Sequence, residues 1–193
     1  MPKLNSFTTI SLDGFFCDSD GDFRWAHNPI QDKAWDNFVA GNAQGGGILL
    51  FGRVTYDIMK SYWPTPMAAQ NNPVVAERMN SMRKIVFSRT LDQTSFSKTA
   101  WSNTQLVKGS LVQEVSRLKQ DCKQGIAILG SGSIVSQLAQ AGLIDEFQIV
   151  IAPIVLGKGR GLFSKLNQHL NLKLTESRSF TNGNVFLRYE PMR

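Results

Sequence analysis

Cysteine and histidine are scarce in this chain of 193 residues. It contains two cysteines, Cys17 and Cys122, which form no CxxC pair, and two histidines, His27 and His169. Zinc sites draw most of their ligands from these residue types, so we expect no metal site. A nucleophilic triad would have to use one of the histidines, and neither lies in a motif that suggests it. The few, widely separated cysteines indicate reduced thiols and a cytoplasmic protein.

Long apolar segments are also lacking. Residues 1–5 include no apolar core of the length that a signal peptide needs. One run, residues 124–144, carries no charge, but a Gly-Ser-Gly-Ser sequence interrupts it. A spanning helix needs about 20 predominantly apolar residues, and turn residues break this run. We therefore expect no membrane association.

Charge of one sign forms no block. Lysine and arginine number 21 and aspartate and glutamate 15, which gives a formal charge of +6, and the basic residues are spread along the chain. Nucleic-acid-binding tails show runs of like charge, so we expect no nucleic-acid partner. The surplus fits either ordinary surface charge or a ligand that carries phosphates.

Predicted strands and helices alternate along most of the chain. The predicted strands are 4–12, 45–52, 84–88, 104–107, 126–129 and 146–156, with a final hairpin of 172–180 and 185–189 around a type I′ turn at Asn182-Gly183. The predicted helices are 32–40, 53–62, 74–82, 111–122 and 134–141. Residues 15–29 are expected to form a long functional loop. This order predicts one α/β domain over residues 1–193, a three-layer sandwich with a mostly parallel sheet and a C-terminal antiparallel hairpin.

Parallel α/β sheets bind ligands at the carboxyl ends of their strands, and the end of the predicted strand 45–52 has suitable residues. Gly52 ends this strand, and a helix begins with Arg53 and Thr55 in its first turn. The N–H groups and positive dipole of such a turn attract anions. Arg53 adds a planar fork of donors for phosphate. The alternative is a tight turn with an exposed arginine.

Two further strand ends are weaker signals on their own. Ser88-Arg89-Thr90 fits a second phosphate, such as the 2′-phosphate that separates NADP from NAD, or a polar loop. Residues 130–134, Gly-Ser-Gly-Ser-Ile, allow a pyrophosphate to approach a helix N-terminus. They form neither a full GxGxxG motif nor a Walker loop. Residues 157–161 are expected to form a flexible turn that brings Lys158 or Arg160 toward a substrate anion.

The order of several motifs points to a known family. The motifs are Ser11-Leu12-Asp13-Gly14, Gly52-Arg53-x-Thr55-Tyr56, residues 85–91, Leu129-Gly130-Ser131-Gly132 and residues 143–157. From Lys3 to Tyr189 the chain resembles the dihydrofolate reductase-like superfamily. Within it, the chain is most similar to the reductase domain of riboflavin biosynthesis, the C-terminal half of a bifunctional deaminase-reductase. The motifs of the zinc deaminase half, His-x-Glu and Pro-Cys-x-x-Cys, are absent from the sequence.

The resemblance implies an NADPH-dependent reductase that forms a homodimer. The residues that it assigns to the cofactor phosphates and the nicotinamide are Gly52, Arg53, Thr55, Ser88, Arg89, Gly130, Ser131, Gly132, Ser133 and Ile134. The resemblance also places Asp13 beside the nicotinamide and the substrate.

Hydride transfer needs a proton source beside the substrate, and two carboxylates are candidates. Asp13 has the suitable position at the end of the first strand, or it forms a turn there. Asp32 follows a tryptophan and a proline in the order of the folate enzymes, though at another spacing, or it caps the helix 32–40. Trp25 and Trp35 line the substrate face or belong to the core.

The leading hypothesis is reduction of the 5-amino-6-(5-phosphoribosylamino)uracil type, as in riboflavin biosynthesis. A ribosyl phosphate would need a further cation, for which Lys158 and Arg160 are the candidates. The alternatives are reduction of a dihydrofolate or another pterin, and a paralogue that binds NADP(H) without catalysis.

Overall fold

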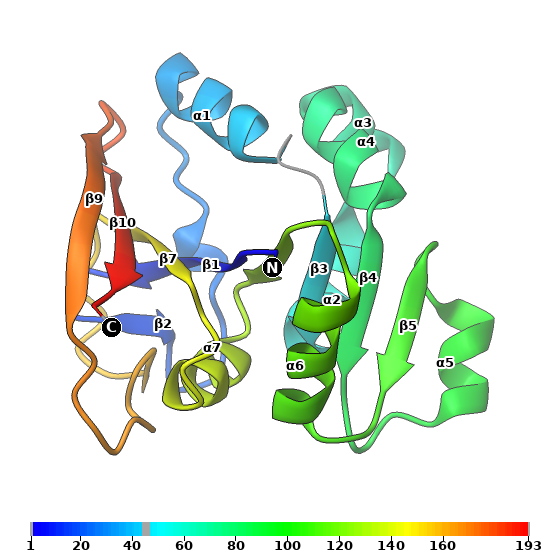
Figure 1. Ribbon diagram of the computed structural model, residues 1–193. Helices are drawn as coiled ribbons and strands as arrows, with labels where there is room; N and C mark the ends of the chain where they lie inside the picture. Colours follow the sequence, from blue (N-terminus) through cyan, green and yellow to red (C-terminus); the bar gives the residue numbers. More distant parts are fainter. Residues whose placement is uncertain (1, 44–46, 193) are drawn as a thin grey trace.

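The computed structural model describes residues 2–43 and 47–192. An eight-stranded sheet runs through it in the order β5-β4-β3-β6-β1-β7-β10-β9, so β5 and β9 form its opposite edges (Figure 1). The strands are β1 (Leu4–Ser11), β3 (Ile48–Gly52), β4 (Arg83–Phe87), β5 (Thr104–Val107), β6 (Ile126–Leu129), β7 (Glu146–Ala152), β9 (Leu172–Ser179) and β10 (Val185–Pro191). The pairs from β5 to β7 are parallel, whereas β10 is antiparallel to β7 and to β9.

Helices cover both faces of the sheet and complete the predicted three layers. On one face lie α6 (Leu111–Asp121) and α7 (Gly132–Gln140). On the other face lie α1 (Lys33–Ala43), α2 (Arg53–Tyr62), α4 (Pro73–Ser81) and α5 (Gln93–Thr99). None of these helices, nor any other in the part of the chain that the structure describes, has the length and apolar character to cross a membrane.

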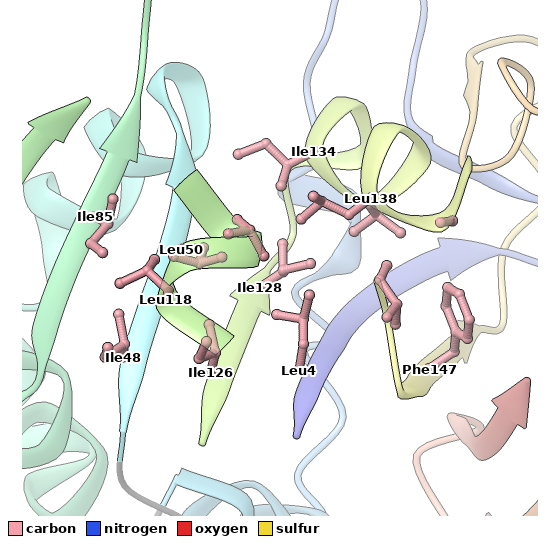
Figure 2. Close-up of a cluster of buried hydrophobic side chains, with 14 of the residues drawn as sticks. Leu4, Ile48, Leu50, Ile85, Leu118, Ile126, Ile128, Ile134, Leu138 and Phe147 are labelled. Atoms are coloured by element: carbon pink, nitrogen blue, oxygen red, sulfur yellow. The ribbon is translucent and has the colours of Figure 1, made fainter. Parts of the chain in front are cut away.

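The central strands are apolar on both faces, as buried parallel strands require. Because successive side chains alternate, Leu50 and Ile128 face α6 and α7, whereas Leu49 and Phe51 face α2 and α4. Figure 2 shows the core on the α6 and α7 side, where the labelled leucine and isoleucine side chains of the strands lie in a row beneath Leu118 of α6 and Leu138 of α7. This alternation builds a separate core on each side of the sheet.

Several short elements lie in segments that the sequence left irregular. The predicted loop 15–29 contains β2 (Phe15–Cys17), which pairs with β8 (Arg160–Gly161), and the 3-10 helix η1 (Arg24–Ala26). The connection before α4 contains α3 (Pro66–Asn71), whose N-cap Thr65 accepts a hydrogen bond from the Ala68 N–H. Elements this short give no clear periodicity, so pattern analysis does not detect them.

The predicted type I′ turn at Asn182-Gly183 is wrong. Such a turn needs positive φ at both central residues, but only Gly183, with φ of 89°, adopts it. The loop is longer, since Ser179 pairs with Val185 across it. The Asn182 side chain turns inward instead, and its Oδ1 accepts a hydrogen bond from the Asn184 N–H.

A charged side chain, Lys84 of β4, is fully buried, with 0% of its surface exposed. Its Nζ donates to the backbone carbonyls of Asn80, Met82 and Ser102 at 3.1, 2.7 and 3.1 Å. It also lies 4.4 Å from the centre of the Trp101 ring. Burial lowers the pKa of this amine to about 8. Lys84 thereby joins the end of α4 to the turn that precedes β5.

Candidate active site

A large cavity of about 1320 Å³ lies across the carboxyl ends of the parallel strands and continues along the α1, α2 and α4 side of the sheet. This volume exceeds the roughly 300–1,000 Å³ of a pocket for one small molecule, so it has room for two ligands. All the predicted cofactor residues line it, namely Gly52, Arg53, Thr55, Ser88, Arg89, Gly130, Ser131, Gly132, Ser133 and Ile134. The fold therefore brings the three predicted strand ends together.

Two of these strand ends are joined by direct hydrogen bonds. The Gly52 N–H donates to Ser131 Oγ at 2.7 Å, and the Ser131 N–H donates to Thr55 Oγ1 at 3.2 Å. Gly130 and Ser131 both adopt the left-handed conformation, with φ of 54° and 52°. This conformation is uncommon for a residue other than glycine and often occurs at functional sites. The ends of β3 and β6 thus form one unit.

Position 132 requires glycine because the Phe16 ring lies close to its Cα, and not because of its backbone angle. A Cβ atom at this position would overlap the ring of Phe16. The Phe16 ring comes from β2, the strand in the segment predicted to be a loop. The absence of a side chain at Gly132 allows this ring to pack against the first turn of α7.

The helices that begin at the cavity, α2 and α7, have open N-termini. Neither has a side-chain cap or an acidic residue in its first turn. By contrast, α3, α5 and α6 are capped by Thr65, Asp92 and Ser110. The first N–H groups of a helix need external partners and carry a partial positive charge. The two open ends are therefore suited to an anion such as phosphate.

Cations follow three adjacent strands at this edge. Arg53 and Lys108 come directly after β3 and β5, Arg89 lies two residues after the end of β4, and all three line the cavity. The Arg53 guanidinium donates to Thr90 Oγ1 at 3.3 Å and lies 3.7 Å from Asp57, and its side chain is 53% exposed. It remains accessible to a ligand. Lys108 was not predicted as a site residue, although it follows a predicted strand as the two arginines do.

The second part of the cavity is a groove between α1 on one side and α2 and α4 on the other. We call it the helix groove. Its floor consists of Asn5, Phe7, Thr9, Leu49, Ala127, Leu129 and Gln148, from β1, β3, β6 and β7. Its walls consist of Val39 and Asn42 of α1, Met59 of α2, Trp63 at the end of α2, and Val75 and Met79 of α4. It provides an apolar slot beside the strand ends.

Asp13, a predicted proton donor, joins the end of β1 to the backbone of Leu156 and Gly157 through hydrogen bonds. Its Oδ1 accepts hydrogen bonds from Ser11 Oγ at 2.6 Å and from the Leu156 N–H at 3.2 Å, and its Oδ2 accepts one from the Gly157 N–H at 2.7 Å. These bonds keep the pKa of Asp13 below its usual value. Asp13 does not line the cavity. The geometry therefore favours the turn-forming alternative over the catalytic one.

Asp32 is likewise occupied by structural hydrogen bonds. Its Oδ1 caps α1 by accepting from the N–H groups of Ala34 and Trp35 at 2.8 and 3.1 Å. Its Oδ2 accepts from Thr181 Oγ1 at 2.7 Å and from the Asn182 N–H at 3.1 Å. The Thr181 hydroxyl and these N–H groups lower the pKa of Asp32 to about 2. This buried carboxylate also lies outside the cavity lining, so the helix-cap alternative describes it.

The residues proposed for the substrate separate in the structure. Arg160 lines the cavity, whereas Lys158 and Trp25 do not. The Trp25 indole N–H donates to the Asp22 carbonyl at 3.1 Å. Trp35 packs edge-on against Phe180 with ring centres 5.1 Å apart, as a core residue. The described residues hold no group of three or more His, Cys, Asp or Glu side chains placed to bind a metal ion.

Comparison with known families decides the relationship. The sequence model of the RibD C-terminal domain matches residues 2–186. The chain belongs to this family. Among curated proteins, it is 28% identical over 181 residues to the uncharacterized protein YyaP of Bacillus subtilis, which covers 93% of this chain and 90% of YyaP. It is 26% identical over 178 residues to YwjB of the same organism, also uncharacterized, which covers 92% of both chains.

Solved structures agree with the membership in the RibD C-terminal domain family. A putative riboflavin biosynthesis protein from Shewanella sp. PV-4 has a TM-score of 0.73 and 25% identity over 99% of both chains. RibD of Acinetobacter baumannii has a TM-score of 0.66 and 18% identity, and the match spans 100% of this chain and 59% of RibD. Dihydrofolate reductase from Enterococcus faecalis, complexed with NADP(H), has a TM-score of 0.62 and 13% identity over 99% of this chain and 97% of that chain. The fold is dihydrofolate reductase-like, and the family supports a reductase-like role.

Proposed function

We propose that the chain is an NADPH-dependent reductase of a heteroaromatic substrate. The observation that carries this proposal is the convergence of two open helix N-termini and three cationic side chains on one cavity, next to the helix groove. NADPH carries a pyrophosphate and a 2′-phosphate. The open helix N-termini suit the pyrophosphate, and the cationic side chains suit the 2′-phosphate. The second ligand then lies in the groove beside the nicotinamide.

The predicted cofactor residues would divide between the two phosphate groups of NADPH. The N–H groups at the starts of α2 and α7 would hold the pyrophosphate, with Arg53 as a further donor. Ser88, Arg89 and Lys108 would surround the 2′-phosphate at the ends of β4 and β5. When bound, NADPH supplies a hydride to the carbon of a substrate C=N bond, whose nitrogen takes up a proton. The side chains of the groove orient the ring and exclude water.

The reaction of the riboflavin branch, reduction of a 5-amino-6-(5-phosphoribosylamino)uracil, is the reaction type that the family membership favours. Reduction of a dihydropterin is the second candidate, in line with the dihydrofolate reductase-like fold. A paralogue that binds NADP(H) without catalysis is the third. It is favoured by the position of Asp13 and Asp32 outside the cavity lining.

Cofactor titration tests the proposal. We expect NADPH to quench the fluorescence of Trp63, which lines the cavity, and to bind at least about tenfold, or ~1.4 kcal/mol, tighter than NADH. Arg89→Ala should remove this preference. Arg83→Ala is the matched control, because Arg83 lies at the other end of β4 and bonds to Gln105. If neither nucleotide binds to the wild-type protein, the reductase proposal fails.

A further inference from the structure

The helix groove lies on one face of four adjacent strands. In the pairing register, Leu49 lies beside Ala127, which lies beside Asn5. One step along, Phe7 lies between Leu129 and Gln148. Because side chains alternate along a strand, these residues all point to the side that carries α1, α2 and α4. The floor of the groove is therefore continuous across β3, β6, β1 and β7.

Charge is distributed unevenly around the cavity. Arg53, Arg89 and Lys108 follow β3, β4 and β5, and Asp20, Arg160 and Lys165 lie in or near the β2–β8 pair and its connecting loops. None of the floor and wall residues that define the groove is charged, and Lys3 lines the cavity beyond the far end of the groove. The Lys3 ammonium is 3.1 Å from Glu190, and its side chain is 66% exposed. The groove thus offers no unpaired cation to an anionic ligand and no carboxylate to a cationic one.

Gln148 is a buried amide on this floor, with 5% of its surface exposed. Its Nε2 donates to Glu146 Oε1 at 2.6 Å, and its Oε1 accepts from Asn42 Nδ2 at 3.1 Å. An ionised carboxylate only accepts hydrogen bonds, so Glu146 determines which end of the amide is nitrogen. Glu146 is in turn paired with Arg188 at 3.4 Å. The amide is fixed in orientation, and each end retains capacity for one further hydrogen bond.

The walls of the groove suit a flat ring. The Trp63 indole N–H lies 3.1 Å from Met59 Sδ, which fixes the indole against α2. Leu49 and Leu129 form the opposing apolar surface of the floor. Aromatic and thioether groups pack well against planar ligands. Gln148 lies two strands from Leu129 on the same floor, with Phe7 between them. A planar ring that extends from Leu129 across Phe7 would meet the Gln148 amide with its far edge.

We infer that the helix groove takes an uncharged, planar heteroaromatic ring without a phosphate, and that Gln148 is the specificity-determining residue that recognises its amide-like edge. This inference rests on the proposed reductase function and defines its substrate class. A phosphate or a carboxylate tail buried in the groove would lose its hydration without gaining a cation, which is costly. A lactam edge, with one donor and one acceptor side by side, matches the free capacity of the Gln148 amide.

The test uses the full chain saturated with NADP⁺ and a matched pair of ligands. The pair is a 5-amino-6-ribosylaminouracil with and without its 5′-phosphate, and binding is followed by Trp63 fluorescence. We expect the phosphate-free ligand to bind at least as tightly as its partner. Tighter binding of the phosphorylated ligand by about tenfold or more, about 1.4 kcal/mol, would overturn the inference. Failure of both ligands to bind would overturn it as well.

Variants test the role of Gln148. Gln148→Met keeps the side-chain volume and should weaken binding of the phosphate-free ligand by about tenfold, since a hydrogen-bonded amide is lost, while the Kd for NADP⁺ stays within about twofold of wild type. Asn42→Ala, at the end of α1, removes only the partner of the amide and should show a smaller loss in a folded protein. Gln105→Met is the matched control, because Gln105 is exposed on β5 outside the cavity. Unchanged ligand affinity in Gln148→Met would rule out its recognition role.

Two results separate this inference from the proposed function. If NADPH does not bind at all, the reductase proposal fails first. If NADPH binds tightly and the phosphorylated ligand is preferred, the reductase proposal stands and only the substrate class is wrong.

Discussion

The strand-end part of the cavity and the helix groove are built in different ways. The strand ends consist of short contiguous motifs, and Gly52, Thr55 and Ser131 bond to one another directly. The groove takes one to three side chains from each of seven helices and strands, none of them adjacent in a recognisable motif. A few consecutive residues are enough to form a phosphate site, because backbone N–H groups make many of the contacts to the phosphate. A site for a ring depends on side chains that only the complete fold brings together.

The two parts differ in electrostatics as well. The strand ends combine helix N-termini with Arg53, Arg89 and Lys108, whereas the groove is apolar with amides on its floor. Binding at the strand ends should therefore depend on charge, and binding in the groove on shape and hydrogen bonds. The following experiments test this contrast, from the largest expected effect to the smallest.

The largest effect is expected for Gly132→Ala. The added methyl group overlaps the Phe16 ring, and overpacking of this kind costs about 1–3 kcal/mol of unfolding free energy. It should also displace the first turn of α7 and weaken NADPH binding. Denaturant unfolding and NADPH titration measure the two effects. Gly41→Ala is the control, because a Cβ there meets no atom within 4 Å and Gly41 lies outside the cavity lining.

The double variant Gly132→Ala with Phe16→Ala tests the cause. If the steric overlap is responsible, the second substitution should recover part of the NADPH affinity, and the two effects should not be additive. Additive losses would show that the two residues act independently.

Salt should separate the two parts of the cavity. Raising the ionic strength from about 0.1 M to about 0.5 M should weaken NADPH binding, because exposed charges are screened over about 10 Å or less in this range. Binding of an uncharged ring in the groove should change little. Lys108→Gln should reduce the salt dependence for NADPH and leave NADH almost unaffected. If NADPH and the uncharged ring showed the same salt dependence, the strand ends and the helix groove would not differ in electrostatics.

Asp32 lies outside both parts of the cavity, and we expect it to affect the stability of the fold in acid. Its pKa is lowered to about 2 by the Thr181 hydroxyl and backbone N–H groups. A lowered carboxylate pKa stabilises the fold above the ordinary value near 3.8, and this contribution is lost as the pH falls toward 2. Asp32→Asn should therefore lower Tm at pH 7 and reduce its fall between pH 4 and 2.

Activity at neutral pH distinguishes a structural from a catalytic role for Asp32. We expect the folded Asp32→Asn variant to keep its NADPH affinity and most of its kcat. Asp36→Asn is the control, since Asp36 is exposed in the first turn of α1. A loss of kcat in a folded Asp32→Asn protein would restore the catalytic assignment.

The smallest effect is expected for Lys158→Ala. Lys158 lies outside the cavity lining, whereas Arg160 lines it. NADPH affinity and groove-ligand affinity should therefore change by less than about twofold, as for most exposed surface substitutions. Arg160→Ala in the same assays gives the comparison. A larger effect of Lys158→Ala would mean that the turn 157–161 moves toward the ligand.

Sequence patterns predicted the regular elements well. The helix 53–62 and the strands 104–107 and 126–129 have the predicted bounds. The helix has a strong apolar periodicity, and the strand 126–129 is a short continuous apolar run. The pattern missed β2 and β8, which have three and two residues and are held by each other across a long separation in sequence. It also missed the inward turn of Asn182, which depends on tertiary hydrogen bonds.

The same distinction applies to the candidate site. The phosphate-suited residues at the strand ends were predictable from local sequence. Gln148 was not, because an amide in the apolar strand β7 gives no signal until Asn42 and Glu146 lie on either side of it. Asp13 and Asp32 are the converse case, since the sequence left a catalytic and a structural role open for each, and the hydrogen bonds to the backbone favour the structural one.

Lys84 has a practical consequence for experiments on this protein. Its amine is fully buried and bonded to three carbonyls, so an amine-reactive reagent should label the exposed lysines of the native protein and leave Lys84 unmodified. Labelling at this position then reports only molecules that have opened around α4 and β5. Mass spectrometry of the peptide that contains Lys84 would give each variant above an internal measure of folding, independent of any ligand.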